Sequence, residues 1–254
     1  MILGILQART SSFRLPNKVM LPVAGAPMLA RHIERLLRAR KMDNLVLATT
    51  DRPEDDCVAE LAVAAGIASY RGSLDDVLDR YYRAAEVYRP SHVVRVTGDC
   101  PLADWDVIDR CIAFTVEGEY DYGSNCLNPT WPDGLDVEVL TFAALGDAWQ
   151  EATSPVDREH VTPFINRQPN RFRLGSFEND TDLSGFRWTV DEPQDYELVR
   201  RVYDALYPTN PAFTTADILQ LLAAQPDLIE FNAGIERNEG LRKAEEALKD
   251  HKHG

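Results

Sequence analysis

The sequence predicts an α/β protein with a mostly parallel central sheet flanked by helices. Two observations indicate this class. Short apolar runs typical of buried strands alternate with longer segments in which apolar residues recur at helical spacing. The alternation continues from residue 2 to residue 97, and strands that are connected through helices pair in parallel by right-handed crossovers.

The regular alternation occupies the first half of the chain. Pro27 can begin the first helix, because a proline lacks an N–H that the first turn does not need. Gly66 is expected to end a second helix, at residues 53–65, and Ser73 to cap a third, at residues 74–88. Mostly apolar runs predict buried parallel strands at residues 2–6, 44–49, 67–70 and 92–97.

The second half is less regular. Residues 120–136 are rich in Gly, Pro, Asn and Asp, which indicates a loop region. A charged helical tail is expected after Glu236, with His251 and His253 in solvent. The other expected elements are a strand at 136–141, a helix at 142–152, a partly helical stretch at 155–167, strands at 172–177 and 186–190, and helices at 193–207 and 214–224.

Charge and composition limit the classes of partner. Lys plus Arg number 27 against 41 Asp plus Glu, a formal net charge of −14, which argues against a nucleic acid because phosphate contacts dominate such binding. No apolar run approaches the roughly 18 residues of a membrane span, and no secretory signal is visible. Because the cysteines lack CxxC spacing, free and mostly buried thiols and a cytoplasmic location are expected. These cysteines are Cys57, Cys100, Cys111 and Cys126.

A basic loop follows the first predicted strand. Arg9, Arg14 and Lys18 lie in residues 8–18, and no acidic residue lies among them. Ligands of an open α/β sheet bind at the carboxyl edge of the strands, where this loop begins. Arginine and lysine suit phosphate oxygens, so the loop could cradle a polyphosphate. The alternative is a solvated loop whose cations pair with nearby carboxylates.

Two aspartates follow later predicted strands. Gly98 allows close backbone approach beside Asp99, and Mg²⁺ is usually held by one or two carboxylates together with substrate phosphates. Asp191 could complete such a pair. The alternatives are a turn aspartate at Asp99 and a helix cap at Asp191, because Pro193 begins a helix there. Asp195 is more plausibly placed to favour the helix dipole.

Two further stretches suggest contacts to small molecules. Arg71-Gly72-Ser73 could meet the flat edge of a base, or could form a simple strand-to-helix turn. The irregular region from 116 to 184 is where a second substrate would bind. A lone histidine on a helix, such as His160, is more often a structural hydrogen-bonding residue than a general base. The candidate residues of this region are Asp133, Asp136, Glu138, Arg158 and His160.

Together these stretches resemble the cytidylyltransferases that activate acidic sugars as CMP conjugates. Residues 8–18, ARTSSFRLPNK, are similar to that family's A-R-x-x-S-x-R-L-P-x-K loop, in which Gly often stands where this chain has Asn17. Residues 98–102 are similar to its G-D-x-P-L motif, and residues 191–195 to its D-x-P-x-D segment. The RGS, GLDVEV and REHVT stretches resemble the subgroup named for SpsF, a spore-coat polysaccharide biosynthesis protein.

The resemblance implies a Rossmann-like, nucleotide-diphospho-sugar transferase fold in one domain and a homodimer. Residues 1–115 would bind the nucleotide, residues 116–184 would form an irregular α+β insertion for acceptor binding and dimerisation, and residues 185–254 would return a strand and C-terminal helices. It implies that Arg14, Lys18 and Asp99 are catalytic and that Asp99 and Asp191 bind Mg²⁺. The nucleotide would contact Gln7, Ala8, Arg9, Ser11, Arg14, Lys18, Arg71, Gly72, Ser73 and Asp99.

The implied reaction transfers CMP from CTP to a 2-keto sugar acid, of the nonulosonic or KDO type, and releases pyrophosphate. Two alternatives stay open. A related enzyme could use another nucleotide, or a phosphonate or sugar-phosphate acceptor. The chain could instead be a non-catalytic nucleotide-binding protein of a glycan pathway. No general base emerges beyond His160, and neither the acceptor nor the reason for Asn17 follows from the sequence.

Overall fold

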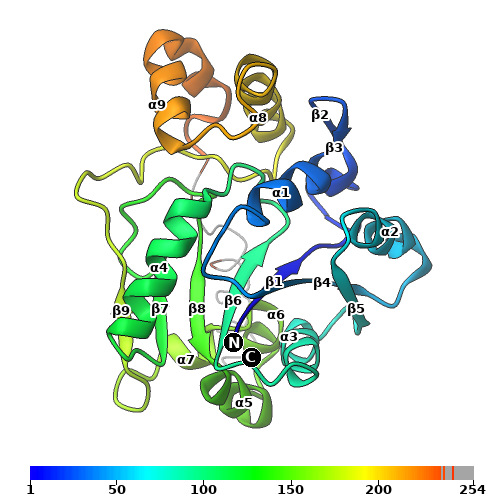
Figure 1. The fold of residues 1–254 in the computed structure, drawn as a ribbon, viewed down its shortest axis with the longest axis vertical. Helices are drawn as coiled ribbons and strands as arrows, with labels where there is room; N and C mark the ends of the chain where they lie inside the picture. The colour runs from blue at the N-terminus through cyan, green and yellow to red at the C-terminus, as the bar shows by residue number, and fades with distance from the viewer. Residues whose placement is uncertain (236, 238–241, 243–254) are drawn as a thin grey trace, which may run out of the picture.

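A seven-stranded sheet forms the centre of the molecule in the computed structural model, which describes residues 1–235, 237 and 242. Its spatial order is β5-β4-β1-β6-β8-β7-β9, and helices pack around it (Figure 1). The predicted α/β class with a mostly parallel sheet is confirmed. The strands are β1 (Ile2–Gln7), β4 (Asn44–Thr50), β5 (Ala68–Gly72), β6 (His92–Thr97), β7 (Tyr122–Ser124), β8 (Glu138–Thr141) and β9 (Leu174–Ser176).

The parallel half of the sheet places two loops side by side. Gln7, at the end of β1, pairs in register with Ala48 of β4 and with Thr97 of β6. The chain therefore leaves β1 and β6 at the same carboxyl edge. The basic loop at residues 8–18 and the Gly98-Asp99 turn begin there as neighbours, and the Gly98 N–H donates to the Gln7 carbonyl at 2.7 Å.

Helices cover both faces of the sheet, because successive strand residues point to opposite sides. Leu6 packs into one core, and Leu3 and Ile5 pack into the other. The first core also takes side chains from α1 (Met28–Leu36), α2 (Asp56–Ala64), α4 (Trp105–Glu117), α8 (Pro193–Leu206) and α9 (Thr215–Ala224). The second takes them from α3 (Val77–Glu86), α5 (Phe142–Glu151) and α7 (Pro163–Asn166), and α6 (Pro155–His160) packs beside α3.

Short elements complete the connections. A small ribbon of β2 (Pro22–Val23) and β3 (Ala26–Pro27) leads into α1 and contacts α8. Single-turn 3₁₀ helices lie at Lys18–Met20 (η1) and Pro53–Asp55 (η2), and a longer one at Pro226–Asn232 (η3). The helical tail expected after Glu236, with His251 and His253, lies outside the described residues apart from residues 237 and 242.

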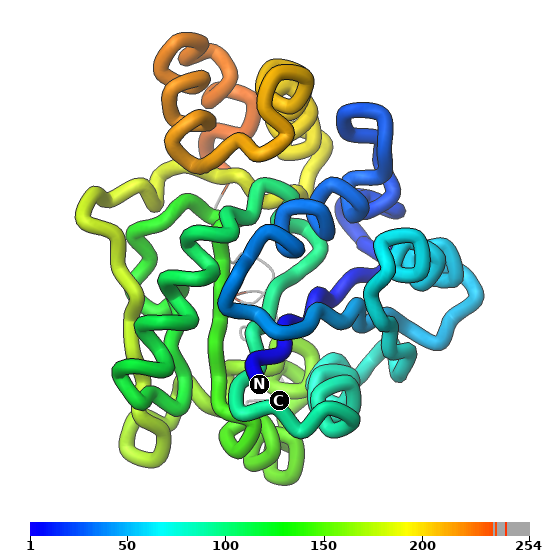
Figure 2. The backbone as a smooth tube through the Cα atoms, in the orientation of Figure 1, coloured from blue at the N-terminus to red at the C-terminus, as the bar shows by residue number. Residues whose placement is uncertain are grey.

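The strand predicted at residues 186–190 does not form, and this prediction is wrong. Its only ladder contact in the described chain is a single bridge between Arg187 and Asp133. The backbone N–H groups instead bond to loops: Thr189 to the Asp133 carbonyl at 3.0 Å and Val190 to the Asp99 carbonyl at 2.8 Å. Figure 2 shows the yellow segment before α8 crossing above the ends of the central strands. Residues 187–190 are all buried, but they are buried among loops and not by pairing as a strand.

Other elements differ from the sequence predictions in their extent. Helix α3 begins at Val77, and its cap is the Asp76 carboxylate, which accepts from the Asp79 N–H, so the cap predicted at Ser73 is wrong. Helix α4 was not predicted, and strand β7 lies within residues 120–136, for which a loop region with short extended pieces was predicted. β7, β8 and β9 extend the main sheet, with β8 antiparallel to β6 and to β7.

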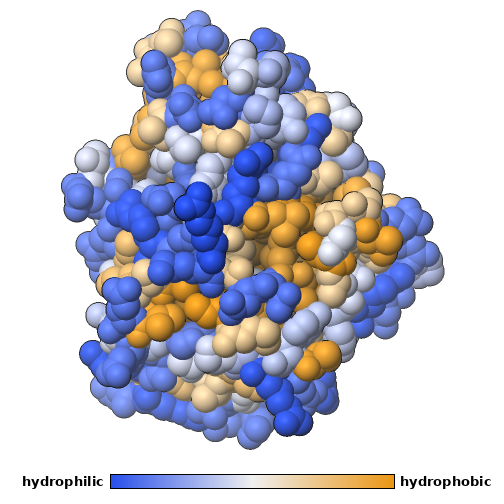
Figure 3. Space-filling model, in the orientation of Figure 1, coloured by the Kyte–Doolittle hydropathy of each residue, from blue (hydrophilic) through white to orange (hydrophobic). Residues whose placement is uncertain are grey.

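The surface is mainly hydrophilic on the face that Figure 3 shows, with a patch of apolar side chains between α1 and α2. Within the described residues, no helix is long and apolar enough to cross a membrane. The four cysteines are free thiols, and Cys100 and Cys111 are buried.

Candidate active site

The buried carboxylate of Asp55 holds the basic loop in place. Asp55 Oδ1 accepts the Thr10 N–H and the Thr10 hydroxyl, both at 2.7 Å. The loop closes on itself where the Asn17 N–H donates to the Thr10 carbonyl at 2.8 Å. Asn17 then adopts φ 60°, in the left-handed region. Glycine and asparagine tolerate this region best, which accounts for Asn17 where the resembled family often has Gly.

Lys18 reaches from the end of this loop into the interior. Its Nζ donates to Asp191 Oδ1 at 2.8 Å and to the Val190 carbonyl at 2.7 Å, and lies 3.3 Å from Asp99 Oδ2. Burial alone lowers the pKa of this lysine, but the two carboxylates outweigh burial and raise it. Lys18 is therefore a fixed, fully charged ammonium between two aspartates.

Asp99 is positioned by the end of β6. A Cβ on the preceding Gly98 would lie 2.8 Å from the Ala8 Cβ and 3.0 Å from the Gln7 carbonyl, so only glycine allows this approach. The Thr97 hydroxyl donates to Asp99 Oδ1. Burial raises the pKa of Asp99, yet Lys18 and the Thr97 hydroxyl more than offset this and hold the pKa well below its usual range. Asp99 is thus ionised at neutral pH.

Asp191 faces the same site and does not cap a helix. The cap of α8 is Glu192, whose carboxylate pairs with the first turn in a capping box with Asp195. Asp195 accepts the Asp191 and Glu192 N–H groups at 3.0 and 2.9 Å, as expected for an acid in the first turn. Asp191 Oδ2 is left to meet Arg14 Nη2 at 3.0 Å. The interpretation of Asp191 as a helix cap is therefore wrong.

Arg187 is a buried residue of the site that sequence reasoning missed. Its guanidinium bonds Asp133 at 2.7 Å, Asp191 at 3.2 Å and Asp195 at 2.9 and 3.0 Å. All three of its nitrogens are engaged, so it locks the segment before α8 against the Asp133 loop. The signal was present, since a lone arginine between Phe186 and Trp188 must find a partner when the segment is buried.

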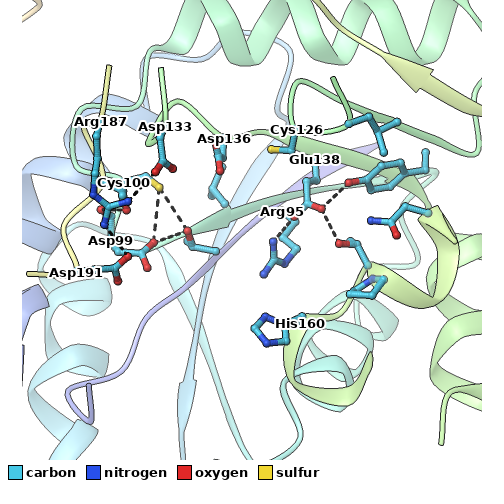
Figure 4. A pocket seen from close by; sticks show the side chains of 18 of the residues that line it. Arg95, Asp99, Cys100, Cys126, Asp133, Asp136, Glu138, His160, Arg187 and Asp191 are labelled. Carbon is cyan, nitrogen blue, oxygen red and sulfur yellow. Dashed lines mark hydrogen bonds and ion pairs between the residues drawn. The ribbon is translucent and has the colours of Figure 1, made fainter. Parts of the chain in front are cut away.

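Arg14, Asp99, Arg187 and Asp191 help to line a cleft of about 360 Å³ (Figure 4). In the close view, Asp99, Asp191 and Arg187 lie on one side, Asp136 in the middle, and Arg95 and His160 on the other. The cleft brings together seven of the sequence candidates: Arg14, Asp99, Asp133, Asp136, Glu138, His160 and Asp191. It adds Arg95, Tyr122, Cys126, Thr162, Asn166 and Arg187, which were not predicted.

The middle of the cleft is acidic. Burial is the main cause that raises the pKa of Asp133, to about 6, and the neighbouring Asp136 raises it further. Burial likewise raises the pKa of Asp136. Arg237 limits the rise by bonding Asp136 Oδ1 at 2.6 Å.

Other candidates lie outside this cleft. Arg158 bonds Asp76 through Nε at 3.0 Å and the Trp149 carbonyl through Nη1 at 2.8 Å. Arg71 is similarly engaged by two carbonyls and by Asp56 Oδ1 at 2.6 Å. The structure thus joins each of these arginines to neighbouring protein groups, and their roles toward a substrate stay predictions.

A second cleft, of about 610 Å³, also borders the basic loop. Thr10, Ser11 and Asn17 line it from the loop, and Leu74 lines it from beside Ser73. The Leu74 carbonyl receives the Arg9 Nη1 donor at 3.4 Å. The loop is therefore bordered by open space at residues 10, 11 and 17 as well as at Arg14. The remaining residues of this second cleft are Arg52, Glu54, Asp55 and Cys57.

The protein groups at this site supply two of the ligands that a divalent cation needs, and not a complete coordination shell. No group of three or more His, Cys, Asp or Glu side chains is arranged for a metal within the described residues. Asp99 and Asp191 nevertheless converge on a single cationic group, the Lys18 ammonium, within 3.3 Å. Two converging carboxylates with further ligands from a polyphosphate match the usual coordination of Mg²⁺ in proteins.

The chain was compared with known proteins. A family model described as cytidylyltransferase matches residues 3–244. An uncharacterised protein of Methanocaldococcus jannaschii, MJ1063, is 36% identical over 249 residues, which cover 96% of this chain and 99% of that protein. The spore coat polysaccharide biosynthesis protein SpsF of Bacillus subtilis is 32% identical over 236 residues, covering 89% and 95%.

A solved structure gives the same result for the fold. A cytidylyltransferase from Leptospira borgpetersenii superposes with a TM-score of 0.87 at 30% sequence identity. The match covers 93% of this chain and 99% of that one.

Proposed function

Because the chain belongs to the cytidylyltransferase family and is therefore a nucleotidyltransferase enzyme, we propose that it transfers CMP from CTP to an acidic sugar. The similarity to SpsF supports a place in polysaccharide biosynthesis. The single observation that carries the proposal is the position of Lys18. Its buried ammonium lies between the Asp99 and Asp191 carboxylates, and Arg14 also contacts Asp191. Two cations and two carboxylates therefore meet at one side of the cleft.

The basic loop would bind the triphosphate. Arg14 lines the cleft and can contact the phosphate oxygens, while the buried Lys18 lies behind Asp99 and Asp191 and acts on the phosphates through its charge. Their charge would stabilise the departing pyrophosphate, where negative charge accumulates during the reaction. The second cleft next to Thr10 and Ser11 offers room for the rest of the nucleotide.

Asp99 and Asp191 would hold Mg²⁺. A bound magnesium ion would supply charge neutralisation at the phosphoryl oxygens. The low pKa of Asp99 keeps this ligand ionised throughout the neutral range. Because Lys18 bonds both carboxylates, it fixes their separation before any ion binds.

The reaction is an in-line displacement that needs little covalent chemistry from the protein. A hydroxyl oxygen of the acceptor forms a bond to the α-phosphorus of CTP. The bond from that phosphorus to the bridging oxygen breaks, pyrophosphate leaves, and the hydroxyl proton passes to water. Positioning of the two substrates and charge neutralisation supply most of the rate enhancement.

The acceptor would occupy the 360 Å³ cleft, which has the volume of a small-molecule site and polar side chains along its length. The resemblance of the loop and of the G-D-x-P-L motif to enzymes that activate acidic sugars favours a 2-keto sugar acid. Phosphonate or sugar-phosphate acceptors, and other nucleotides, are the alternatives. A non-catalytic role is disfavoured by the membership of a nucleotidyltransferase family and by the convergence of Lys18, Asp99 and Asp191. The homodimer and the cytoplasmic location stay predictions.

Pyrophosphate release tests this function. The purified protein is incubated with Mg²⁺ and each of CTP, UTP, ATP and GTP, against N-acetylneuraminate, KDO, aminoethylphosphonate and glucose 1-phosphate. Release with CTP and a sugar acid is expected. Release that requires another nucleotide, or that occurs only with the phosphonate or the sugar phosphate, would contradict the proposal.

A further inference from the structure

Arg95 is a charged residue within the central sheet. It lies on β6, between the apolar Val94 and Val96, and only 16% of its side chain is exposed. A buried cation is costly unless it is paired and hydrogen-bonded. The Tyr81 ring lies 5.6 Å from the guanidinium and shields it further. The sequence candidates did not include Arg95, although it lines the cleft beside His160 (Figure 4).

Glu138 fixes the position of this arginine. The two residues face each other in register across β6 and β8, and Arg95 Nη1 donates to Glu138 Oε2. Glu138 Oε1 accepts the Tyr122 and Thr162 hydroxyls, each at 2.6 Å. The carboxylate therefore has three protein donors from separate parts of the chain. Glu138 thus acts as a support for Arg95, and its oxygens are already engaged before any acceptor binds.

Part of the Arg95 guanidinium remains without an acceptor. Nε is buried and has no hydrogen-bond partner. Within the described residues, Nη1 alone of the guanidinium nitrogens makes a hydrogen bond, to Glu138. Because Nε is shielded from solvent, Nη2 is the guanidinium donor that a ligand in the cleft can reach. A fixed cation that lines a substrate cleft with this donor unsatisfied is a recognition site for an anionic group.

The other arginines near the acceptor region are engaged differently. Arg187 uses all three nitrogens on aspartates. Arg158 binds Asp76 through Nε and Nη2, and it does not line the cleft. Arg95 is also separated from the carboxylate pair by the middle of the cleft, where Asp136 lies (Figure 4). An acceptor that lies along the cleft can therefore reach Arg95 with one end and the Asp99 side with the other.

We propose that Arg95 binds the carboxylate of the acceptor and selects acids over neutral sugars, with Glu138 as its positioning residue. This inference rests on the proposed function and names the part of the cleft that reads the substrate. The sequence had suggested Arg158 as a residue that could meet a substrate carboxylate, and the proposal assigns that contact to Arg95 on β6 instead. His160 and Asn166 line the same cleft and can contact the rest of the acceptor.

Steady-state kinetics with KDO, its carboxamide and aminoethylphosphonate test the proposal. Wild type is expected to prefer the acid over the carboxamide by at least 100-fold in kcat/KM. Arg95→Lys keeps the charge but loses the planar guanidinium, which Glu138 holds on one side while Nη2 faces the cleft, so the acceptor KM is expected to rise at least 30-fold and the preference to fall below 10-fold. The KM for CTP is expected to stay within 2-fold. Arg173→Met, which removes an exposed arginine paired with Glu119, is the matched control.

Removal of one partner of the buried Arg95–Glu138 pair can unfold the protein. The double variant Arg95→Gln/Glu138→Gln is therefore measured beside Arg95→Lys. It is expected to fold and to bind CTP, with the same loss of preference for the acid. Glu138→Gln alone is expected to raise the acceptor KM and leave the CTP KM unchanged. A Glu138→Gln enzyme with both KM values unchanged would overturn the positioning role.

The outcomes separate the two proposals. Activity on KDO that Arg95→Lys leaves unchanged would overturn the role of Arg95 and leave the proposed function intact. Loss of acceptor affinity in Arg158→Met but not in Arg95→Lys would do the same. Turnover of KDO that does not depend on Arg95, beside turnover of the phosphonate that does, would overturn the carboxylate assignment and leave the proposed function intact. Wild type that releases no pyrophosphate with CTP and either sugar acid would overturn the proposed function itself.

Discussion

The Lys18 ammonium donates to the Asp191 carboxylate at 2.8 Å, across a separation of 173 residues. The same nitrogen lies 3.3 Å from Asp99, so three distant motifs converge on one atom. A lysine in this position neutralises two carboxylates and orients them toward the cleft. The contact also links the basic loop to the segment before α8, and several consequences of it can be measured.

Lys18→Met should lower kcat by about 100- to 1,000-fold, the usual loss when one charged donor of a transition state is removed. The methionine fills a similar volume but leaves Asp99 and Asp191 without their shared cation. Pyrophosphate release measures kcat, and circular dichroism checks the fold. Lys41→Met, at an exposed position, is the control and should keep full activity. A folded Lys18→Met enzyme with normal kcat would show that the ammonium does not act on the triphosphate.

Asp99→Asn should raise the Mg²⁺ concentration for half-maximal activity at least 10-fold. The amide keeps the shape of the side chain but removes the negative charge that holds a divalent cation. Magnesium titrations of wild type and variant at saturating CTP give the comparison. An unchanged magnesium requirement would count against Asp99 as a ligand. Asn128→Asp, at an exposed site, controls for a general change in charge.

Asn17→Gly should leave stability nearly unchanged, whereas Asn17→Val should lower the free energy of unfolding by about 1–2 kcal/mol. The reason is the left-handed backbone at this residue, φ 60°, which a β-branched side chain strongly disfavours. Urea unfolding measures both variants. Equal stability of the valine and glycine variants would refute the backbone explanation for Asn17.

Stability should fall as the pH drops below 6.5, because of His32. This histidine is fully buried in α1, and neither ring nitrogen has a hydrogen-bond partner among the residues that the structure describes. Burial is the main cause that lowers its pKa to about 3. Arg35 lowers the pKa further, while Asp99 opposes the shift. Between pH 6.5 and 3 the unfolded chain binds a proton that the folded state rejects. This costs about 1.4 kcal/mol per pH unit over that range.

The variant His32→Leu isolates this effect. It removes the titrating ring and should flatten the dependence of the unfolding free energy on pH between 6 and 4, relative to wild type. Urea unfolding at several pH values provides both curves. Parallel curves for the two proteins would show that His32 is not the group that titrates.

Sequence reasoning succeeded where local pattern determines structure. The parallel strands β1, β4 and β6 were predictable because each is a mostly apolar run that lies inside the sheet and is largely buried. The place of the loop at residues 8–18 beside the Gly98-Asp99 turn was predictable because both follow parallel strands at one edge of the sheet. Asp99 could be located because it follows a predicted strand and because the preceding Gly98 indicates a close approach of two backbone segments.

The remaining features depend on long-range pairing, which a single sequence does not reveal. Residues 186–190 alternate like a strand, but their hydrogen bonds go to the loops at Asp99 and Asp133. Arg158 seemed available to a substrate because its partner, Asp76, lies 82 residues away. Arg95 seemed to be an ordinary strand residue, because its partner Glu138 becomes its neighbour only when β8 pairs antiparallel with β6.

The most direct test of the central claim is the rate of pyrophosphate release from CTP and KDO or N-acetylneuraminate in the presence of Mg²⁺. The account predicts release that depends on both the nucleotide and a sugar acid, exceeds the rates with UTP, ATP and GTP, and falls at least 100-fold in Lys18→Met. Equal rates with all four nucleotides, or release from CTP that no acid increases, would contradict it.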